Sequence, residues 1–241
     1  MPRKRDKKTE VQRSRLMLNT EEAQQNDYDL IICDVMMPKM NGYEVVSRLK
    51  SKFDTCHIPI ILLTALGAEE NQLKGITTGA DAYITKPFSP RLLLARVIQL
   101  IDQRNRIRER FASETTTKET PSAASICTNP LDKKFMEKFN QLLSQRLTDP
   151  DLSLDELARE LAVGRTVFFR KVKGVTGFTP NEYIRVMRLK KAAEMLAEGE
   201  YTVNDTAYSV GYNDPLYFSR CFKQQFGVSP SAYLKGDRRQ D

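Results

Sequence analysis

The sequence predicts two domains: a doubly wound α/β domain with a parallel sheet, followed by an all-α domain with two similar helical units. The first is predicted by short continuous apolar runs, which are typical of strands covered on both faces and which alternate with helical patterns. The second is predicted by a repeat, because the stretch from Leu152 to Tyr233 resembles itself at an offset of 49 to 50 residues. A chain of 241 residues is long enough for two domains of medium size.

Strands and helices are predicted to alternate through the first domain. The apolar runs that mark strands lie at residues 30–33, 58–63 and 82–85, and the helical patterns lie at residues 43–50, 69–77 and 90–101. Alternation of this kind gives parallel strands with helices on both faces of the sheet.

Changes of composition divide the chain into four segments. Residues 1–27 are basic and carry a short apolar stretch at residues 16–18 that we interpret as a remnant strand; the others are the α/β domain (28–103), a linker (104–130) and the helical domain (131–241). The charged start of the linker is expected to prolong the preceding helix. The remainder is rich in Ser, Thr and Pro and is expected to be flexible.

The net charge of +7 is unevenly distributed along the chain, and one segment of the helical domain is strongly basic. Between Arg165 and Lys191 a single acid, Glu182, stands among eight bases: Arg165, Arg170, Lys171, Lys173, Arg185, Arg188, Lys190 and Lys191. Such a segment is either a solvated helix face or a surface that faces phosphates, and a helix-turn-helix context favours the phosphates.

The cysteines and the hydropathy of the chain exclude several classes of protein. Cys33, Cys56, Cys127 and Cys221 have neither zinc-binding nor disulfide-framework spacing, so a reduced, cytoplasmic protein is expected. No apolar run approaches the roughly 18 residues of a membrane span. No cofactor loop or catalytic triad is present, so we expect no enzyme activity beyond phosphoryl transfer within the first domain.

Three polar residues end the three predicted strands of the sheet. They are Asp34, Thr64 and Lys86, and the carboxyl ends of parallel strands meet at one edge. A carboxylate, a hydroxyl and an ammonium gathered there suit phosphoryl transfer, with Asp34 as nucleophile, Thr64 bonded to a phosphoryl oxygen and Lys86 balancing the charge.

The motifs around these residues resemble the flavodoxin-like receiver domain of two-component response regulators. They are Asp34–Gly42, Leu63–Ala65, Gly79–Tyr83 and Lys86–Phe88. The resemblance implies that Asp34 is the phosphorylation site, that Thr64 and Lys86 are phosphate partners, and that the Lys86–Pro87 bond is cis. It also implies that Tyr83 is a rotating aromatic switch, although half-buried strand packing is an alternative for this residue.

The chain departs from the receiver pattern before Asp34. Receivers hold Mg²⁺ with two acids after a first strand, and we expect this strand, the first helix and the acidic pair to be missing here. Asp34 and the Met36 carbonyl are then the remaining metal ligands, which is few for octahedral Mg²⁺. An alternative function follows, in which a degenerate receiver is a protein-interaction module in a phosphorylation-independent transcription factor.

The repeat in the second domain has the pattern of two helix-turn-helix units. Its register shifts by one residue at the turn, where the loop Tyr212–Pro215 is longer. Ser153 with Glu156, and Thr202 with Asp205, are predicted capping boxes that open the first helix of each unit. Two such units make sequence-specific DNA binding the leading function.

This half resembles the AraC/XylS family of transcriptional regulators, most specifically at Gly211–Lys223 and Phe226–Pro230. The family's recognition helices map to residues 165–173 and 215–223. The outward, DNA-binding positions are then Arg165, Thr166, Phe169, Arg170, Lys173, Leu216, Tyr217, Arg220 and Lys223, and the expected core positions are Phe168, Val172, Phe218 and Phe222. Phe169 and Tyr217 are equally compatible with DNA contact and with packing.

The combination resembles a response regulator, or the carboxy-terminal end of a hybrid two-component sensor. The implied partners are double-stranded DNA, a cognate histidine kinase that belongs to the same or another polypeptide, RNA polymerase, and a second copy bound through the receiver. Because the linker is expected to be flexible, we expect receiver association to control DNA binding. His57 lies in a loop, so a phosphohistidine role is not expected for it.

Overall fold

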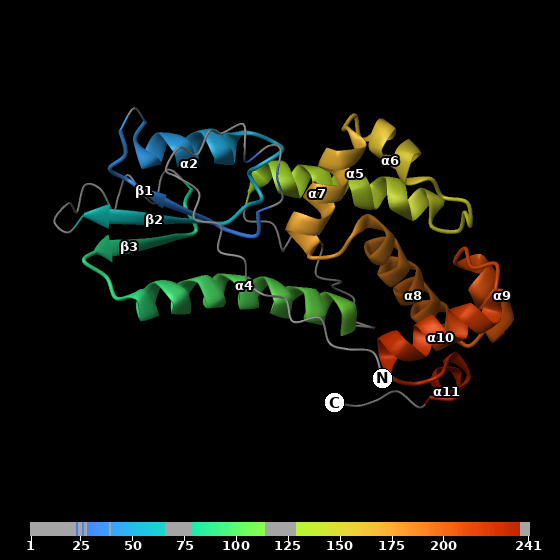
Figure 1. Cartoon of the computed structure of the whole chain (residues 1–241). Coiled ribbons are helices and arrows are strands. Elements are labelled where there is room, and N and C mark those ends of the chain that lie inside the picture. The colour runs from blue at the N-terminus through green and yellow to red at the C-terminus, as the bar shows by residue number, and fades with distance from the viewer. Residues whose placement is uncertain are drawn as a thin grey trace, which may run out of the picture.

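The computed structural model describes residues 23, 26, 28–38, 40–65, 79–113 and 129–236, which form an α/β part followed by a helical part (Figure 1). The expected remnant strand at residues 16–18, the missing first strand and helix, and the helix predicted at residues 69–77 concern segments outside the described residues. The other predicted elements all have counterparts in the structure.

The described strands form one parallel sheet in the order β1-β2-β3. They are β1 (Ile31–Asp34), β2 (Ile60–Ala65) and β3 (Ala82–Lys86). β2 begins two residues later than the apolar run predicts, after Pro59, which has no amide hydrogen to donate to a neighbouring strand. The register pairs Asp34 with Leu63 and Ala65 with Lys86, so the carboxyl ends of the strands lie together as predicted.

Helices cover both faces of this sheet, as a doubly wound arrangement requires. Figure 1 shows α2 (Gly42–Ser51) above the strands and α4 (Pro90–Ser113) below them. Successive residues of β2 point to opposite faces. Ile60 and Leu62 therefore pack in the cluster of α2, whereas Ile61 packs in the cluster of α4.

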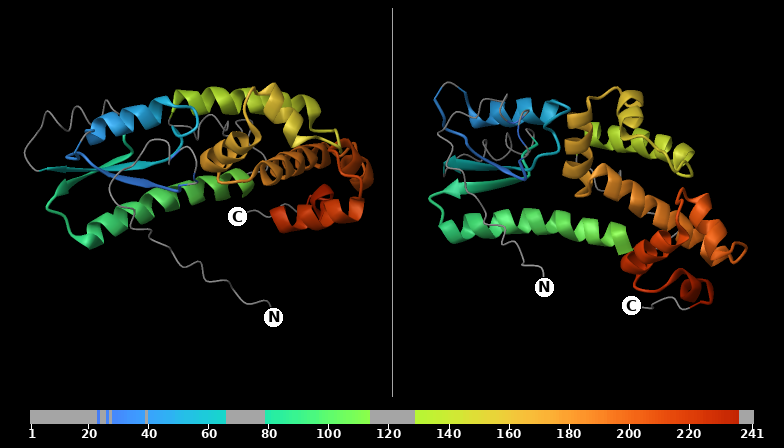
Figure 2. Two further views of the ribbon diagram at one scale, coloured as in Figure 1. Left: turned by 45° about the horizontal axis from the view of Figure 1, so that its top comes forward. Right: turned by 45° about the vertical axis from the view of Figure 1, so that its right-hand side comes forward.

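α4 is longer than the apolar pattern alone predicts. It continues to Ser113, which confirms that the charged start of the linker prolongs the last helix of the sheet domain. Leu93, Val97 and Leu100 pack against the sheet side of this helix. In both views of Figure 2 the helix extends past the sheet toward the helical part.

The helical part contains two further hydrophobic cores joined by one helix. Its elements are α5 (Pro130–Arg146), α6 (Leu154–Glu160), α7 (Arg165–Thr176), α8 (Pro180–Glu198), α9 (Val203–Ser209), α10 (Pro215–Phe226) and α11 (Pro230–Leu234). Tyr183 on α8 belongs to the first core and Leu196 on the same helix to the second, so α8 connects them.

Local sequence explains where these helices begin and end. The Ser153 and Thr202 hydroxyls accept hydrogen bonds from the amides of Glu156 and Asp205, so the hydroxyl half of each predicted capping box is present. A full capping box, with the acid bonding back to the N-cap amide, is formed by Thr179 and Glu182. At Thr202 the carboxylate of Asp205 accepts a bond from the hydroxyl at 2.6 Å. α7 and α10 end at Gly177 and Gly227, both with φ of 75°, a left-handed conformation that favours glycine.

The two parts of the chain are in contact. α4 packs against both α7 and α10, and the loop between α2 and β2 packs against α7 (Figures 1 and 2). Among the described helices, none combines the length and apolar character that crossing a membrane requires.

Candidate phosphoacceptor site and nucleic-acid interface

The three strand-end residues predicted from the sequence meet at the carboxyl edge of the sheet. Asp34 ends β1 and forms an ion pair with Lys86, which ends β3. Thr64 lies one residue before the end of β2 and is 8% exposed. The side chains of Asp34 and Lys86 are 24% and 41% exposed, so this ion pair is accessible from solvent.

The backbone after Asp34 holds the carboxylate in place. The amide of Met36 donates to Asp34 Oδ1 at 3.1 Å, and the amide of Gly42 donates to the carbonyl of Val35 at 3.0 Å. A Cβ atom at Gly42 would lie 2.3 Å from the carbonyl oxygen of Asp34. Glycine is therefore required where α2 starts beside the site.

Three further residues near the carboxyl edge of the sheet bear on the predictions made from the sequence. The Lys86–Pro87 peptide bond is cis, as the resemblance implies. Tyr83 is half-buried and packs beside the core under α2, which agrees with the packing alternative and leaves its switch role as a proposal. Burial, and then the charge of Asp34, raise the pKa of the neighbouring Cys33 thiol to about 11, so this thiol stays neutral.

Among the described residues, no group of three or more His, Cys, Asp or Glu side chains is placed to hold a metal ion. At this edge the donors expected from the sequence are the Asp34 carboxylate and the Met36 carbonyl, whereas Mg²⁺ requires six oxygen ligands in near-ideal octahedral geometry. No step of the chemistry below is therefore assigned to a metal.

The predicted recognition helices correspond to α7 and α10, and most of their predicted DNA-binding residues face outward. Phe168, Val172, Phe218 and Phe222 are fully buried, which confirms the predicted core positions. The exposed or partly exposed set is Arg165, Thr166, Phe169, Arg170 and Lys173 on α7, and Leu216, Tyr217, Arg220 and Lys223 on α10.

On each of these helices an arginine side chain packs against an aromatic ring. The Arg165 guanidinium lies 5.5 Å from the centre of the Phe169 ring and forms an ion pair with Asp155 at 2.6 Å. On α10 the Arg220 guanidinium lies 5.8 Å from the centre of the Tyr217 ring. Phe169 also packs against the first core, whereas Tyr217 is 47% exposed.

The prediction that the whole basic segment faces phosphates is wrong for three of its members. Lys171 is fully buried, and Lys190 is 7% exposed. Arg188 donates from Nε to the carbonyl of Leu147 at 3.1 Å and also donates to the carbonyl of Asp149, and burial lowers the pKa of its guanidinium. All three side chains are at least partly buried along their stems, and Lys171 and Arg188 bind acceptors within the fold, which sequence spacing does not reveal.

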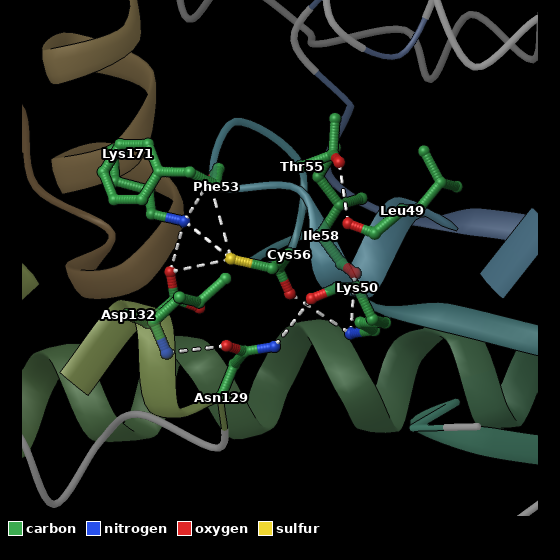
Figure 3. Close-up of polar contacts among 10 residues, drawn as sticks. Leu49, Lys50, Phe53, Thr55, Cys56, Ile58, Asn129, Asp132 and Lys171 are labelled. Carbon is green, nitrogen blue, oxygen red and sulfur yellow. Dashed lines mark hydrogen bonds and ion pairs between the residues drawn. The ribbon is translucent and has the colours of Figure 1, made fainter. Parts of the chain in front are cut away.

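One contact between the two halves of the chain could not be predicted from the sequence. The side chains of Phe53 and Cys56, in the loop between α2 and β2, meet Lys171 of α7 and Asp132 of α5 (Figure 3). Nothing in the periodicity of either segment indicates the pairing, because it depends on how the two domains pack.

Comparison with known proteins assigns both halves of the chain to families. Residues 10–98 match the response regulator receiver domain, and residues 157–236 match the helix-turn-helix domain family. CusR, a transcriptional regulatory protein of Escherichia coli K12, is 33% identical over 160 residues, covering 59% of this chain and 70% of CusR.

A longer relative aligns with nearly the whole chain. Histidine kinase P4 of Formosa agariphila is 36% identical over 211 residues, which cover 88% of this chain and 15% of that protein. The chain therefore spans less than a sixth of this relative. Among solved structures, the carboxy-terminal domain of AraT, a response regulator from Geobacillus stearothermophilus, is 29% identical with a TM-score of 0.40 over 44% of this chain and 88% of that one.

Proposed function

Because the chain belongs to the response regulators that join a receiver domain to an AraC-type helix-turn-helix domain, we propose that phosphorylation of Asp34 controls its binding to specific DNA sites. The observation that carries this proposal is the accessible ion pair of Asp34 with Lys86 at the carboxyl edge of the sheet. It places a nucleophilic carboxylate beside a cation that neutralises an incoming phosphoryl group.

The proposed reaction is a phosphoryl transfer from a histidine kinase. An oxygen of Asp34 attacks the phosphorus of a phosphohistidine, the P–N bond breaks, and the histidine nitrogen leaves with the electron pair. Lys86 then faces the phosphoryl oxygens of the aspartyl phosphate, and the Thr64 hydroxyl donates to one of them. Tyr83, on the neighbouring strand, responds to the new position of Thr64.

DNA is read by two helix-turn-helix units in this proposal. α6 with α7 forms the first unit and α9 with α10 forms the second, with α7 and α10 in the major groove. α8 has 19 residues and so spans about 28 Å at ~1.5 Å per residue. This length is close to the roughly 34 Å between successive major-groove faces, so one chain reaches two adjacent segments.

Further partners are proposed on the same basis. A cognate histidine kinase supplies the phosphoryl group, and RNA polymerase is the target of the bound regulator. Receiver association into a homodimer is supported by an apolar stripe on α4, where Leu94, Ile98 and Ile101 are 59%, 48% and 37% exposed. A contiguous exposed apolar face of this kind is typical of protein contact surfaces.

The phosphorylation step is tested by labelling. Wild-type protein and Asp34→Asn are incubated with a phosphorylated histidine kinase, or with acetyl phosphate and Mg²⁺, and the intact masses are followed with time. We expect one phosphoryl group on the wild type and none on Asp34→Asn. Labelling by acetyl phosphate should be slow if, as expected from the sequence, Asp34 and the Met36 carbonyl are the protein's remaining Mg²⁺ ligands. Equal labelling of both proteins would move the phosphoacceptor away from Asp34 and contradict the proposal.

A further inference from the structure

Leu216 lies on the face of α10 that also carries two exposed cations. Leu216, Arg220 and Lys223 follow one another at intervals of four and three residues, so the three side chains share one face of the helix, and all three are exposed. Leu216 is 77% exposed and belongs to none of the hydrophobic clusters that the described residues form. This leucine therefore contributes to no core of the fold, and its apolar surface is open to a partner.

The backbone that carries Leu216 is fixed by its neighbours. The carboxylate of Asp214 accepts a hydrogen bond from the amide of Leu216 at 2.8 Å, and Pro215 begins the helix with its restricted φ. The ring of Tyr217 lies 6.1 Å from the ring of Tyr212, which is buried in the core of the second unit. Leu216 is therefore an exposed side chain on a well-defined stretch of backbone at the start of α10.

The first helix-turn-helix unit has a polar residue at the position that corresponds to Leu216. The repeat aligns Thr166 with Leu216 and Arg165 with Pro215. The side chains of Arg165 and Thr166 both carry hydrogen-bond donors, whereas those of Pro215 and Leu216 carry none. The cations that follow correspond in the two units: Arg170 with Arg220, and Lys173 with Lys223. The two recognition helices therefore differ most in chemistry where each of them begins.

The chemistry of the major groove indicates what an exposed leucine at this position can contact. A recognition helix of this kind places its amino-terminal residues against the base edges. Among the four bases, only thymine presents a methyl group in the major groove, and the other groups there are hydrogen-bond donors and acceptors. Leucine has no donor or acceptor in its side chain, so the thymine methyl group is the complementary feature. Because two exposed cations share the face of Leu216, the partner that this surface favours is DNA.

We propose that Leu216 is a specificity-determining residue, which selects thymine through its 5-methyl group at one position of the operator segment under α10. Thr166 presents a hydroxyl group at the corresponding position of α7, so the segment under α7 differs in sequence. The operator then consists of two unlike adjacent segments, and their order fixes the direction in which the chain lies on DNA. This inference rests on the proposed role of α10 in reading DNA.

Removal of single methyl groups from the DNA tests the inference. A duplex is selected from a random library by the full wild-type chain, and each of its thymines is replaced in turn by uracil, which lacks only the methyl group. Dissociation constants are measured by fluorescence anisotropy at one salt concentration. For the wild type, one replacement should weaken binding about fourfold, the effect of returning one methyl group to water. For Leu216→Ala the same replacement should have little effect, because the contact is already lost.

Thr166→Ala is the matched control, at the corresponding exposed position of the first unit. It should keep the fourfold effect of the sensitive uracil, because it leaves Leu216 in place. A second control returns the methyl group on another base. With 5-methylcytosine at the sensitive position, the wild type should bind more tightly than with cytosine, and Leu216→Ala should not distinguish the two. Both substituted residues are exposed, so the melting temperatures of the variants should match that of the wild type.

A change of preference tests the same residue in the opposite direction. Glutamine is able to form two hydrogen bonds with adenine in the major groove. Duplexes selected from the random library by Leu216→Gln should therefore carry adenine in place of the sensitive thymine. The segment under α7 should keep its sequence, since none of its proposed reading residues has changed.

The outcomes separate this inference from the proposed function. If no uracil replacement distinguishes the wild type from Leu216→Ala, or if the wild type and Leu216→Gln select the same sequence, Leu216 does not read thymine. Its exposed surface would then be assigned to a protein partner, while DNA binding by the chain would stand. If the wild type enriches no sequence from the library, sequence-specific DNA binding is contradicted and the role of Leu216 with it.

Discussion

The surroundings of each lysine determine whether its ammonium group is exposed on the surface or enclosed within the fold. Lys171 is enclosed by Asp132, Cys56 and Phe53, whereas Lys191 pairs with Glu194 on the surface, where the two side chains are 53% and 44% exposed. Burial and then Asp132 raise the pKa of the Cys56 thiol, while Lys171 opposes the change. A neutral thiol therefore donates toward Asp132 and accepts from Lys171.

The difference between these lysines gives a prediction about stability. Lys171→Met should lower the free energy of unfolding by about 3–5 kcal/mol, because it leaves Asp132 buried without its cation. Lys191→Met should change it by less than about 1 kcal/mol, because exposed pairs contribute little. Urea denaturation measures both.

The double variant Lys171→Met with Asp132→Leu separates the loss of the pair from the loss of packing. Replacing a whole buried pair by apolar groups is often nearly neutral, so most of the stability should return. Equal costs for Lys171→Met and Lys191→Met would show that Lys171 is not enclosed in solution.

The helices and strands that could be predicted from the sequence are those whose position depends on local apolar periodicity and on strand order. The apolar pattern predicts the strands and the helices α2 and α4, and local sequence predicts the N-caps at Ser153 and Thr202. The parallel topology predicts that Asp34, Thr64 and Lys86 lie at one edge of the sheet. The structural roles of Lys171, Arg188 and Lys190 do not follow, because they depend on how distant segments of the chain pack together. The same reason hides the contact of Gly174 with His57, which is visible only once the domains are packed.

The repeat predicts corresponding roles for Arg170 of α7 and Arg220 of α10. Arg170→Ala and Arg220→Ala should each weaken binding to a selected operator by roughly 1–3 kcal/mol if these arginines read bases. Binding of random duplex should change far less. Anisotropy titrations on both duplexes measure the difference.

A control on the same helix face distinguishes base reading from phosphate contact. Lys223→Ala, at an exposed lysine of α10, should weaken binding to both duplexes alike and reduce the salt dependence by about one counterion. Should Arg220→Ala behave in the same way as Lys223→Ala, its assignment to base reading is wrong.

Across the whole molecule, the chain links the proposed phosphoacceptor edge of the sheet to the two proposed recognition helices, α7 and α10. α2 starts in the turn after Asp34 and ends before the loop that carries Phe53, Cys56 and His57. α4 leaves the sheet and reaches α7 and α10. The contact between the halves is direct, so it offers a physical route for the proposed control of DNA binding besides the receiver association that the sequence predicts.

The proposed control of DNA binding by phosphorylation of Asp34 is tested by one ratio of dissociation constants. The dissociation constant for a duplex selected from a random library is measured for wild-type protein with and without phosphorylation, and for Asp34→Asn after the same treatment. We expect phosphorylation to tighten binding by the wild type at least about fivefold and to leave the affinity of Asp34→Asn unchanged. Equal affinities of phosphorylated and unphosphorylated wild-type protein would contradict it.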